Sequence, residues 1–472
     1  MGRVHTLVNS NFAKITEVMA MSREDISSIG EVSPARLWAW RLLQRVEQDD
    51  AYVDRLLEVT LRRVDLTAPD RALLTELVHG VVRWKKRLDF ILQAFSRHPI
   101  QRYPLPVLTA LRLGAYQLLY LDRIPEYAVI HQAVELVKSH GKATAGLVNA
   151  ILRALQRHRG ALPEPTLEDT VRYLSLAHSY PEWIVRRWVA RFGPEETVKL
   201  LQVQNRRPRL SLRVNQRRMG VEEFLVWLQE RGSTAWMSPY VPQAVVVERL
   251  AHEVLEEVIN QGWASVQDVS SLLVVQLADP QPTMQVIDLC GAPGGKACAI
   301  GERLGEEGHL TVVDIHPGRL NIVKREALRL GIADRMSFSV TDARSFQHVP
   351  VDLVLLDAPC SGLGTIAKKP DIKWRRRESD IGALAKLQRE LLEHAATLVC
   401  PGGVLVYSTC TTEPEENEEV VLDFLRRHPE FVLEPAQRWL PVEVCQGGFF
   451  QTLPHRHQDC DGAFAARLRR RE

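Results

Sequence analysis

The N-terminal third of the chain places its apolar residues three to four positions apart. Five such stretches lie within residues 33–160, separated by proline and glycine, and this spacing predicts amphipathic helices. Ser33 followed by Pro34 is typical of a helix start. We therefore predict an all-α domain over 33–160, and a disordered tail over residues 1–32, which have no long apolar period. The five stretches are ARLWAWRLLQRVEQ, RALLTELVHGVVRWKKRLDFILQAF, PVLTALRLGAYQLLYL, AVIHQAVELVKSH and TAGLVNAILRAL.

The rest of the chain alternates short apolar runs with helical stretches. After a proline-containing break, GALPEPTLEDT, residues 166–262 mix short helices with the strand-like runs RLSLRVN and AVVVERL, which predicts a small α+β segment. In residues 263–472 helical stretches separate the runs MQVIDLC, HLTVVDI, MSFSV, VDLVLLDAP and GGVLVYSTC. This alternation predicts a parallel, doubly wound α/β sheet in which the loops after the strands meet at one edge and bind ligands.

Composition and cysteine usage narrow the class of protein. The 472 residues are 45% hydrophobic and 25% charged, as in a globular protein of two or three domains. The apolar runs are too short to span a bilayer, and the N-terminus lacks the apolar core of a secretory signal. Seven cysteines without regular spacing predict a reducing cytoplasm and no disulfide framework. No Cys/His cluster has zinc-ligand spacing, and we expect His455 and His457 to be loop residues and no metal to be bound.

The net charge of +2 conceals three clusters of basic residues. A single run of charges is more often a solvated face than a binding site. The cluster KKPDIKWRRR, residues 368–377, differs because its basic residues surround Trp374, and arginine both neutralises phosphate and stacks on bases. We interpret this cluster as facing RNA. The other two clusters are RRPRLSLRVNQRR, at 206–218, and the four terminal arginines Arg467, Arg469, Arg470 and Arg471.

A glycine-rich turn follows the first strand of the α/β region. In DLCGAPGGK, Gly291, Gly294 and Gly295 let the backbone turn tightly and approach a ligand, and the next helix offers free N–H groups. The turn is neither a dinucleotide GxGxxG pattern nor a P-loop, so alone it is weak evidence. Asp314 ends the second strand, where a carboxylate can bind ribose hydroxyls, and Asp342 follows the third, in reach of an adenine amino group. Each aspartate alone could equally cap a helix, but three ordered loops fit an adenosine cofactor with a donor group, best S-adenosylmethionine.

Two cysteines follow the fourth and fifth strands. Cys360 lies in DAPCSG, three residues after Asp357, and Cys410 lies in YSTCTTEPEENE. A thiolate is the protein nucleophile strong enough to add to a pyrimidine ring at neutral pH. Thr412 and Pro414 predict a helix start just after Cys410, whose positive end would favour a thiolate, although the acidic residues that follow oppose this effect.

These two cysteines predict chemistry on a base. An enzyme that methylates an amino group would be expected to carry an Asn/Asp-Pro-Pro-aromatic string after the fourth strand, and this chain has a cysteine there instead. Burial as small hydrophobic side chains accounts for the other five cysteines. Physical reasoning does not rank Cys360 and Cys410 as nucleophiles.

Together these motifs resemble those of the RsmB (Sun/Fmu) family of RNA cytosine-5 methyltransferases. The strings that carry the resemblance are DLCGAPGGK, DAPCSG, PDIKWRR, STCTTEPEENE and DGAFAARL. The stretches LVHGVVRWKKRLD, LRLGAYQLLYL, VIHQAVELVK and GLVNAILR likewise resemble the NusB family of RNA-binding helical domains, which extends the RsmB family at its N-terminus. The resemblance implies a Rossmann-like S-adenosylmethionine-dependent methyltransferase domain and, as substrate, a cytosine of small-subunit (16S) ribosomal RNA. It gives no sign of a membrane or of a protein partner.

The resemblance also implies a role for each site residue. Cys410 would add to carbon-6 of the cytosine, Cys360 would assist removal of the carbon-5 proton and release of the product, and Asp357 would hold the base at N3/N4. The family commonly has Ala at Gly291 and Thr at Ala297, and the extra glycine is expected merely to loosen the turn; DGAFAARL also lacks one common aromatic. The implied cofactor positions are Cys290, Gly291, Ala292, Pro293, Gly294, Gly295, Lys296, Asp314, Asp342 and Asp357.

Other hypotheses stay open at this point. The same chemistry could act on tRNA or on another rRNA cytosine, or the chain could be a non-catalytic RNA-binding or ribosome assembly factor. A lost Cys410 or a broken glycine-rich turn would favour the last, and both are intact. The sequence leaves open whether the helical domain contacts RNA, for example through Asn149 and Arg153 on one face of its last helix.

Overall fold

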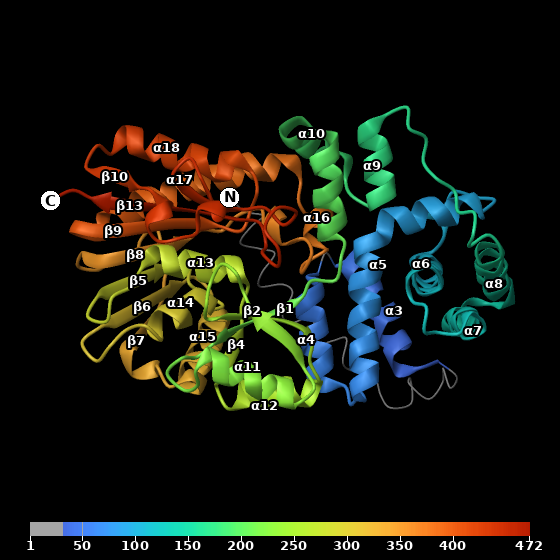
Figure 1. Cartoon of the computed structure of the whole chain (residues 1–472). Helices are drawn as coiled ribbons and strands as arrows, with labels where there is room; N and C mark the ends of the chain where they lie inside the picture. The colour runs from blue at the N-terminus through green and yellow to red at the C-terminus, as the bar shows by residue number, and fades with distance from the viewer. Residues whose placement is uncertain (1–31, 50) are drawn as a thin grey trace. The chain divides into compact units, whose positions relative to one another are not determined.

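The computed structural model describes residues 32–49 and 51–472, and these form two compact units. One unit contains the described residues up to Val198 together with Lys369–Arg375, and the other contains Lys199–Lys368 and Arg376–Glu472 (Figure 1). Apart from residue 32, the predicted tail over 1–32 lies outside the described residues. No helix in the described part of the chain is long and apolar enough to cross a membrane.

In the described residues of the first unit, all regular secondary structure is helical. Each of the five stretches predicted from three-to-four spacing is a helix, which confirms the prediction, and α4 and α9 are two helices that it missed. Buried residues of α3 to α8 form its core, and between α5 and α6 Tyr116 occupies the space that a side chain at Gly80 would need. Asn149 and Arg153 are both exposed. The helices are α3 (Pro34–Gln48), α4 (Val53–Arg63), α5 (Ala68–Ala94), α6 (Leu105–Tyr120), α7 (Glu126–Leu136), α8 (Lys142–Arg157) and α9 (Thr170–His178).

The short helix α16 (Ile372–Arg375) belongs to this helical unit although it comes from much later in the chain. Lys373 is fully buried; its Nζ donates to the carbonyl of Arg83 at 2.8 Å and lies 3.9 Å from the ring centre of Tyr180. Trp374 donates its indole N–H to the carbonyl of Val82 at 2.7 Å. Burial, followed by the charge of Arg83, lowers the pKa of Lys373 well below its usual value. The interpretation of this cluster as facing RNA is therefore wrong for Lys373 and Trp374, which pack inside the helical unit.

A small antiparallel sheet follows α10 (Glu182–Gln204), which bends where Gly193 takes a φ of 78° before Pro194. The strand order is β2-β3-β1-β4. Two strands and two helices of this segment, one of them α10, are as predicted. The prediction missed α12, and it missed β2 and β4 because strands of three or four residues are too short to show an alternating pattern. The elements are β1 (Leu210–Val214), α11 (Val221–Glu230), β2 (Thr234–Met237), β3 (Ala244–Arg249), α12 (His252–Asn260) and β4 (Ala264–Val266).

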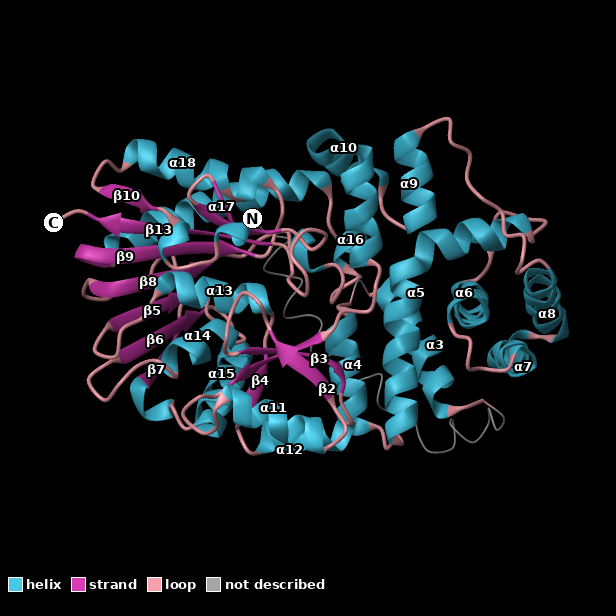
Figure 2. Ribbon diagram, viewed as in Figure 1, coloured by secondary structure: helices cyan, strands magenta, loops and turns pink. Residues whose placement is uncertain are grey.

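The large sheet begins with five parallel strands in the order β7-β6-β5-β8-β9. They coincide with the five predicted runs, which confirms them: β5 (Gln285–Leu289), β6 (His309–Asp314), β7 (Met336–Val340), β8 (Val351–Asp357) and β9 (Val399–Thr409). The expectation of a wholly parallel sheet is wrong, because β13 (Ala463–Arg470) runs antiparallel to β9 and three further antiparallel strands continue the sheet, two paired with β13 and one beyond them (Figure 2). These are β10 (Phe431–Glu434), β11 (Cys445–Gln446) and β12 (Phe449–Thr452).

Helices cover both faces of this sheet, as strand alternation requires (Figure 1). Val286 of β5 packs towards α13 (Val269–Ala278), α14 (Gly295–Gly301) and α15 (Pro317–Leu330). The next residue, Ile287, packs in the core of the other face, formed with α17 (Glu378–Thr397) and α18 (Glu418–Arg427). The strands are thus buried on both sides, and their carboxyl ends are left to carry the functional loops.

Several arginines of the first and third basic clusters are structural. Arg213 is 2% exposed and bonds to Glu302 at 2.9 Å. Arg467 and Arg469 both bond to Glu434, at 2.7 and 2.8 Å. An arginine buried in this way is held by its carboxylate and is not available to a ligand, so a run of arginines in the sequence overstates the exposed charge.

Candidate active site

The three loops predicted to bind a cofactor meet at the carboxyl ends of β5, β6 and β7. The N–H of Gly291 donates to the carbonyl of Val313 at 3.0 Å, which holds the glycine-rich turn beside the end of β6. Thr341 donates its N–H to the carbonyl of Asp314 at 3.2 Å, so the loop after β7 lies beside the same strand end. Gly294 has a φ of 102°, a conformation that favours glycine. The structure therefore brings the turn and both aspartate-bearing loops together.

The carboxyl group of Asp288 is buried under this turn. Its side chain is fully buried, and neither carboxyl oxygen has a hydrogen-bond partner. A Cβ at position 291 would lie 2.7 Å from the Cγ of Asp288, so Gly291 makes room for this carboxyl instead of merely loosening the turn. Burial, followed by the charge of Asp357, raises the pKa of Asp288 well above its usual value. The strand end beneath the turn thus carries a polar group with unused hydrogen-bonding capacity. Sequence reasoning missed it because Asp288 lies within the apolar strand.

Neither of the two predicted cofactor aspartates caps a helix. Asp314 accepts a hydrogen bond from the N–H of His316 at 2.8 Å and lies 3.5 Å from Arg319, while α15 begins after His316 without a side-chain cap. Asp342 accepts from the N–H of Arg344 at 3.0 Å and pairs with its guanidinium at 2.7 Å. A carboxylate offers about four acceptor positions, so the contacts of Asp314 leave room for the hydroxyl groups of an adenosine.

The two predicted cysteines lie side by side at the ends of β8 and β9. In the parallel register Asp357 stands opposite Ser408, which brings the two following loops together. The Sγ atoms of Cys360 and Cys410 are 3.3 Å apart, within hydrogen-bond distance for sulfur, and the N–H of Cys410 also lies 3.3 Å from the Sγ of Cys360. A pair of residues fifty positions apart in the sequence therefore forms one thiol pair.

A charged pair lies next to the cysteines. Lys296, the last residue of the glycine-rich turn, places its Nζ 2.8 Å from Oδ2 of Asp357, and Ser408 donates its hydroxyl to Oδ1 at 2.8 Å. Burial alone would lower the pKa of Lys296, but Asp357 and then Cys410 outweigh it and hold that pKa above its usual value. Lys296 therefore stays an ammonium ion, and its interaction with Cys410 joins the cofactor turn to the cysteine pair.

The surroundings of the two thiols differ. The hydrogen bond with Cys410, followed by burial, raises the pKa of Cys360 well above its usual value. Cys360 therefore keeps its proton, and although the distance allows either sulfur to donate, Cys360 is the donor that this pKa favours. The ammonium of Lys296 acts on Cys410.

The predicted helix start directly after Cys410 is wrong. Pro414–Glu416 form a single 3-10 turn, and α18 begins only at Glu418. Thr412 donates its hydroxyl to Glu413 at 3.1 Å and caps no helix. Because a helix dipole acts only within the first turn, the positive charge near Cys410 comes from Lys296 and not from α18.

Three residues that sequence reasoning missed hold the Cys360 loop in place. Glu416 is fully buried, and its Oε2 accepts from the N–H of Ser361 at 2.8 Å and from Gln388 at 3.0 Å. Arg376 donates to the carbonyl of Cys360 at 3.0 Å. Sequence reasoning gave the acidic run after Cys410 only an effect on the charge near this cysteine, and it interpreted the basic cluster of Arg376 as facing RNA. The signal that could have found Glu416 is its place in the string that carries Cys410.

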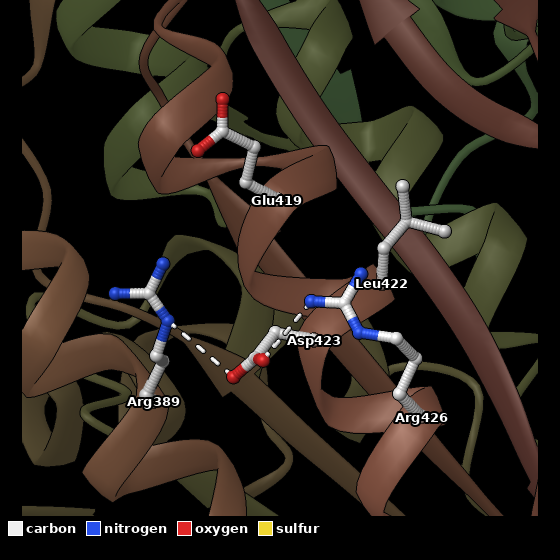
Figure 3. A pocket seen from close by; sticks show the side chains of 5 residues that line it. All are labelled: Arg389, Glu419, Leu422, Asp423 and Arg426. Carbon is white, nitrogen blue, oxygen red and sulfur yellow. Dashed lines mark hydrogen bonds and ion pairs between the residues drawn. The ribbon is translucent and has the colours of Figure 1, made fainter.

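Other features of this unit offer less chemistry. A hollow of about 290 Å³ between α17 and α18 is lined by an ion-pair cluster, in which Asp423 lies 3.6 Å from Arg389 and 3.1 Å from Arg426 (Figure 3). None of the five residues drawn there carries a thiol. Within residues 32–49 and 51–472, no group of three Cys, His, Asp or Glu side chains could hold a metal ion.

Known proteins match the chain over most of its length. The model of the 16S rRNA methyltransferase RsmB/F family matches residues 275–469, that of the NusB family matches 33–157, and that of the ferredoxin-like domain of RsmF/B-like methyltransferases matches 180–252. The protein named probable ribosomal RNA small subunit methyltransferase B in Bacillus subtilis (strain 168) is 36% identical over 446 residues, covering 92% of this chain and 98% of that protein. The chain belongs to the RsmB/F family.

Further RsmB/F relatives agree with this assignment. The ribosomal RNA small subunit methyltransferase B of Proteus mirabilis (strain HI4320) is 34% identical over 397 residues, covering 82% of this chain and 91% of that protein. The crystal structure of PH0851 is similar with a TM-score of 0.76 and 28% identity, covering 93% of this chain and 99% of that one. The expected fold, a NusB domain, an α+β segment and an α/β methyltransferase domain, is thereby confirmed.

RsmB/F proteins are methyltransferases that depend on S-adenosylmethionine. The residues of this chain fit such a cofactor, because the carboxyl of Asp288 has unused hydrogen-bonding capacity beneath the turn over 290–296. When bound, S-adenosylmethionine supplies the methyl group.

Proposed function

We propose that this chain methylates carbon-5 of a specific cytosine in small-subunit (16S) rRNA through a covalent cysteine–cytosine adduct. The observation that carries the proposal is the thiol pair, with Sγ atoms 3.3 Å apart, beside the ion pair of Lys296 and Asp357. The relatives in Bacillus subtilis and Proteus mirabilis, both named small-subunit rRNA methyltransferases, support the substrate.

Cys410 is the nucleophile in this mechanism. Carbon-5 of cytosine is too weakly nucleophilic to accept a methyl group directly, and addition of a thiolate at carbon-6 turns it into the reactive carbon of an enamine. Cys410 carries out this addition, because Lys296 stabilises its thiolate and the S–H of Cys360 donates to its sulfur. Asp357 has a half-exposed side chain and accepts from the exocyclic amino group at N4, which fixes the base.

Cys360 acts after the methyl group has reached carbon-5. Once the sulfur of Cys410 is bonded to carbon-6, the hydrogen bond that contributes most to the raised pKa of Cys360 weakens. Cys360 can then lose its proton to water and accept the proton from carbon-5. The electrons of that C–H bond form the C5–C6 double bond, the C6–S bond breaks, and Cys410 leaves as a thiolate.

The remaining site residues hold the cofactor in this account. Residues 290–296 form the turn, with Asp314 for the ribose hydroxyls and Asp342 for the adenine amino group. We retain 33–160, 166–262 and 263–472 as domain boundaries. None of the seven cysteines forms a disulfide, which supports the expected cytoplasmic location.

Mapping of 5-methylcytosine tests the proposal. Mass spectrometry of rRNA and tRNA from cells with and without the gene is expected to show that one 16S cytosine loses its methyl group. A gene encoding the Cys410→Ala variant serves as the control, because it should fail to restore the methyl group while keeping the fold. Loss at a tRNA cytosine or at a different rRNA would support the alternative substrates. If every cytosine keeps its methyl group, the chain acts as a non-catalytic RNA-binding or assembly factor.

A further inference from the structure

A groove of about 1040 Å³ runs along the second unit, outside the cysteine and cofactor sites. Its walls come from five places in the sequence: the segment between α10 and β1, the end of β3 with the start of α12, Asp268 before α13, the pair Ala367 and Lys368, and residues 454–461 between β12 and β13. Residues that are distant in the sequence thus form one continuous surface.

The groove is positively charged. Two of its cations form ion pairs with its four carboxylates, each within 4 Å. Lys368 pairs with Asp268 and Asp461, and Arg209 pairs with Asp459 and Glu248. Four more arginines line the groove and are exposed, namely Arg206, Arg207, Arg249 and Arg456. Six cationic side chains against four carboxylates leave a net charge of +2, with the two histidines of the groove, His252 and His455, neutral.

The groove divides the first basic cluster of the sequence into two parts. Arg206, Arg207 and Arg209 reach the groove, whereas Arg213 is buried against Glu302. The guanidinium of Arg209 lies 5.1 Å from the ring centre of Trp236, which supports it from one side. Half of the cluster is therefore structural, and the half at its N-terminal end is presented to a ligand.

One end of the groove is tied to the loop that carries Cys410. Gly462, which follows Asp461 of the groove, donates its N–H to the carbonyl of Gly364 at 2.9 Å. Gly364 in turn donates to the carbonyl of Cys410 at 3.1 Å. A side chain at Gly364 would overlap the carbonyl of Gly462, so the two backbones are in direct contact. The groove therefore starts within two backbone hydrogen bonds of the nucleophile.

We infer that this groove binds the sugar–phosphate backbone of the single-stranded RNA next to the target cytosine. This inference rests on the proposed function and adds to it the surface that receives the flanking strand. Positively charged grooves that follow the backbone are the usual means of binding single strands, and arginine pairs with phosphate through two N–H groups at once.

The position of the groove favours RNA over an acidic protein segment. A cytosine that reaches Cys410 brings its own backbone with it, so a strand must leave the site along a neighbouring surface. The groove is the surface that the Asp461–Gly462 segment joins to the Cys410 loop. An acidic peptide would bind the same arginines, but its binding would not require a groove that begins next to Cys410.

Two double variants of the full chain test the inference, Arg206→Gln/Arg207→Gln and Arg249→Gln/Arg456→Gln. Binding of an unmethylated 16S rRNA fragment is measured at several salt concentrations, together with kcat and KM for methylation. Each phosphate contact that is lost lowers the slope of log affinity against log salt by about 0.7, and two lost contacts weaken binding about tenfold at moderate salt. KM for RNA should rise accordingly, with kcat and the affinity for S-adenosylmethionine unchanged.

Arg325→Gln/Arg426→Gln is the matched control, since both arginines are exposed in the same unit and lie outside the groove. If the groove variants match this control in affinity and slope, the groove does not bind RNA and the inference is wrong. Weaker binding only to particles that contain ribosomal proteins, with naked RNA unaffected, would also overturn it and indicate an acidic protein surface. A wild-type chain that binds RNA with the expected slope but methylates nothing would refute the proposed function and leave the groove standing.

Discussion

The two halves of the candidate site are built differently. In the loop after β8, the peptide group between Cys360 and Ser361 is held at both of its polar atoms, by Arg376 at the carbonyl and by Glu416 at the N–H. Near the end of β5, beneath the glycine-rich turn, the buried carboxyl of Asp288 instead has no hydrogen-bond partner. The Cys360 loop is thus held by protein groups alone, whereas the strand end beneath the glycine-rich turn keeps unused hydrogen-bonding capacity. Lys296 is the residue that joins the two halves.

Replacement of Lys296, whose charge links the two halves, should lower activity more than any other change described below. Lys296→Gln leaves Asp357 without its ammonium partner and Cys410 without a neighbouring positive charge. We expect kcat to fall about 10²- to 10³-fold, the range for loss of one well-placed electrostatic group. The rate–pH profile should also move to higher pH, because a thiolate without that charge forms less readily.

Lys324→Gln, an exposed lysine on α15, is the control for this variant. Since the pKa of Lys296 is raised, the wild-type ammonium is present throughout the neutral range, and titration of Lys296 itself should not limit the rate there. An unchanged pH profile in Lys296→Gln would show that the ammonium does not act on the nucleophile.

In the half of the site that holds the cysteines, Gly364 is in close contact with the backbone of Gly462. Gly364→Ala places a methyl group against the carbonyl of Gly462 and should cost about 2–4 kcal/mol of unfolding free energy, as overpacking of a backbone contact does. Methylation should fall as well, because Gly364 donates to the carbonyl of Cys410. Denaturant unfolding and single-turnover assays measure both effects.

Gly382→Ala provides a matched comparison within α17. A Cβ at Gly382 meets no atom within 4 Å, and in a helix interior alanine should stabilise by about 0.5–1 kcal/mol. Equal stabilities of the Gly364→Ala and Gly382→Ala chains would contradict the close backbone contact beneath Cys410.

The smallest effect is expected from a change at Asp288, beneath the glycine-rich turn. Asp288→Asn removes a carboxyl whose folded pKa is raised, so the wild type loses stability as the pH rises from about 4, the unfolded value, through the folded pKa. The variant does not share this loss and should gain melting temperature at neutral pH relative to wild type. We also expect affinity for S-adenosylmethionine to fall about tenfold, as for one lost hydrogen bond to a charged or polar ligand group.

Calorimetry across pH and titration with S-adenosylmethionine measure these effects, with Glu306→Gln on the surface as the control. A melting temperature that is lower than that of wild type at neutral pH would mean that Asp288 is ionised and satisfied, and the contrast between the two halves would fail.

Much of this architecture could be predicted from the sequence. The five parallel strands followed from their apolar runs, and the thiol pair followed from two cysteines at the ends of adjacent strands. Asp288 escaped prediction because nothing in a strand pattern reveals an unpartnered carboxyl. Lys373 and Arg213 were misjudged because burial depends on where the fold places a charge. Thr412 was misjudged because a 3-10 turn and a helix start share the same signals.

The central claim is that Cys410 attacks the base and Cys360 assists its release. A denaturing gel of the protein incubated with S-adenosylmethionine and unmethylated 16S rRNA tests it most directly. Cys360→Ala is expected to accumulate a covalent protein–RNA adduct, because the C6–S bond forms but the product is not released, and Cys410→Ala is expected to form none. An adduct that accumulates in Cys410→Ala and is absent from Cys360→Ala would contradict the account.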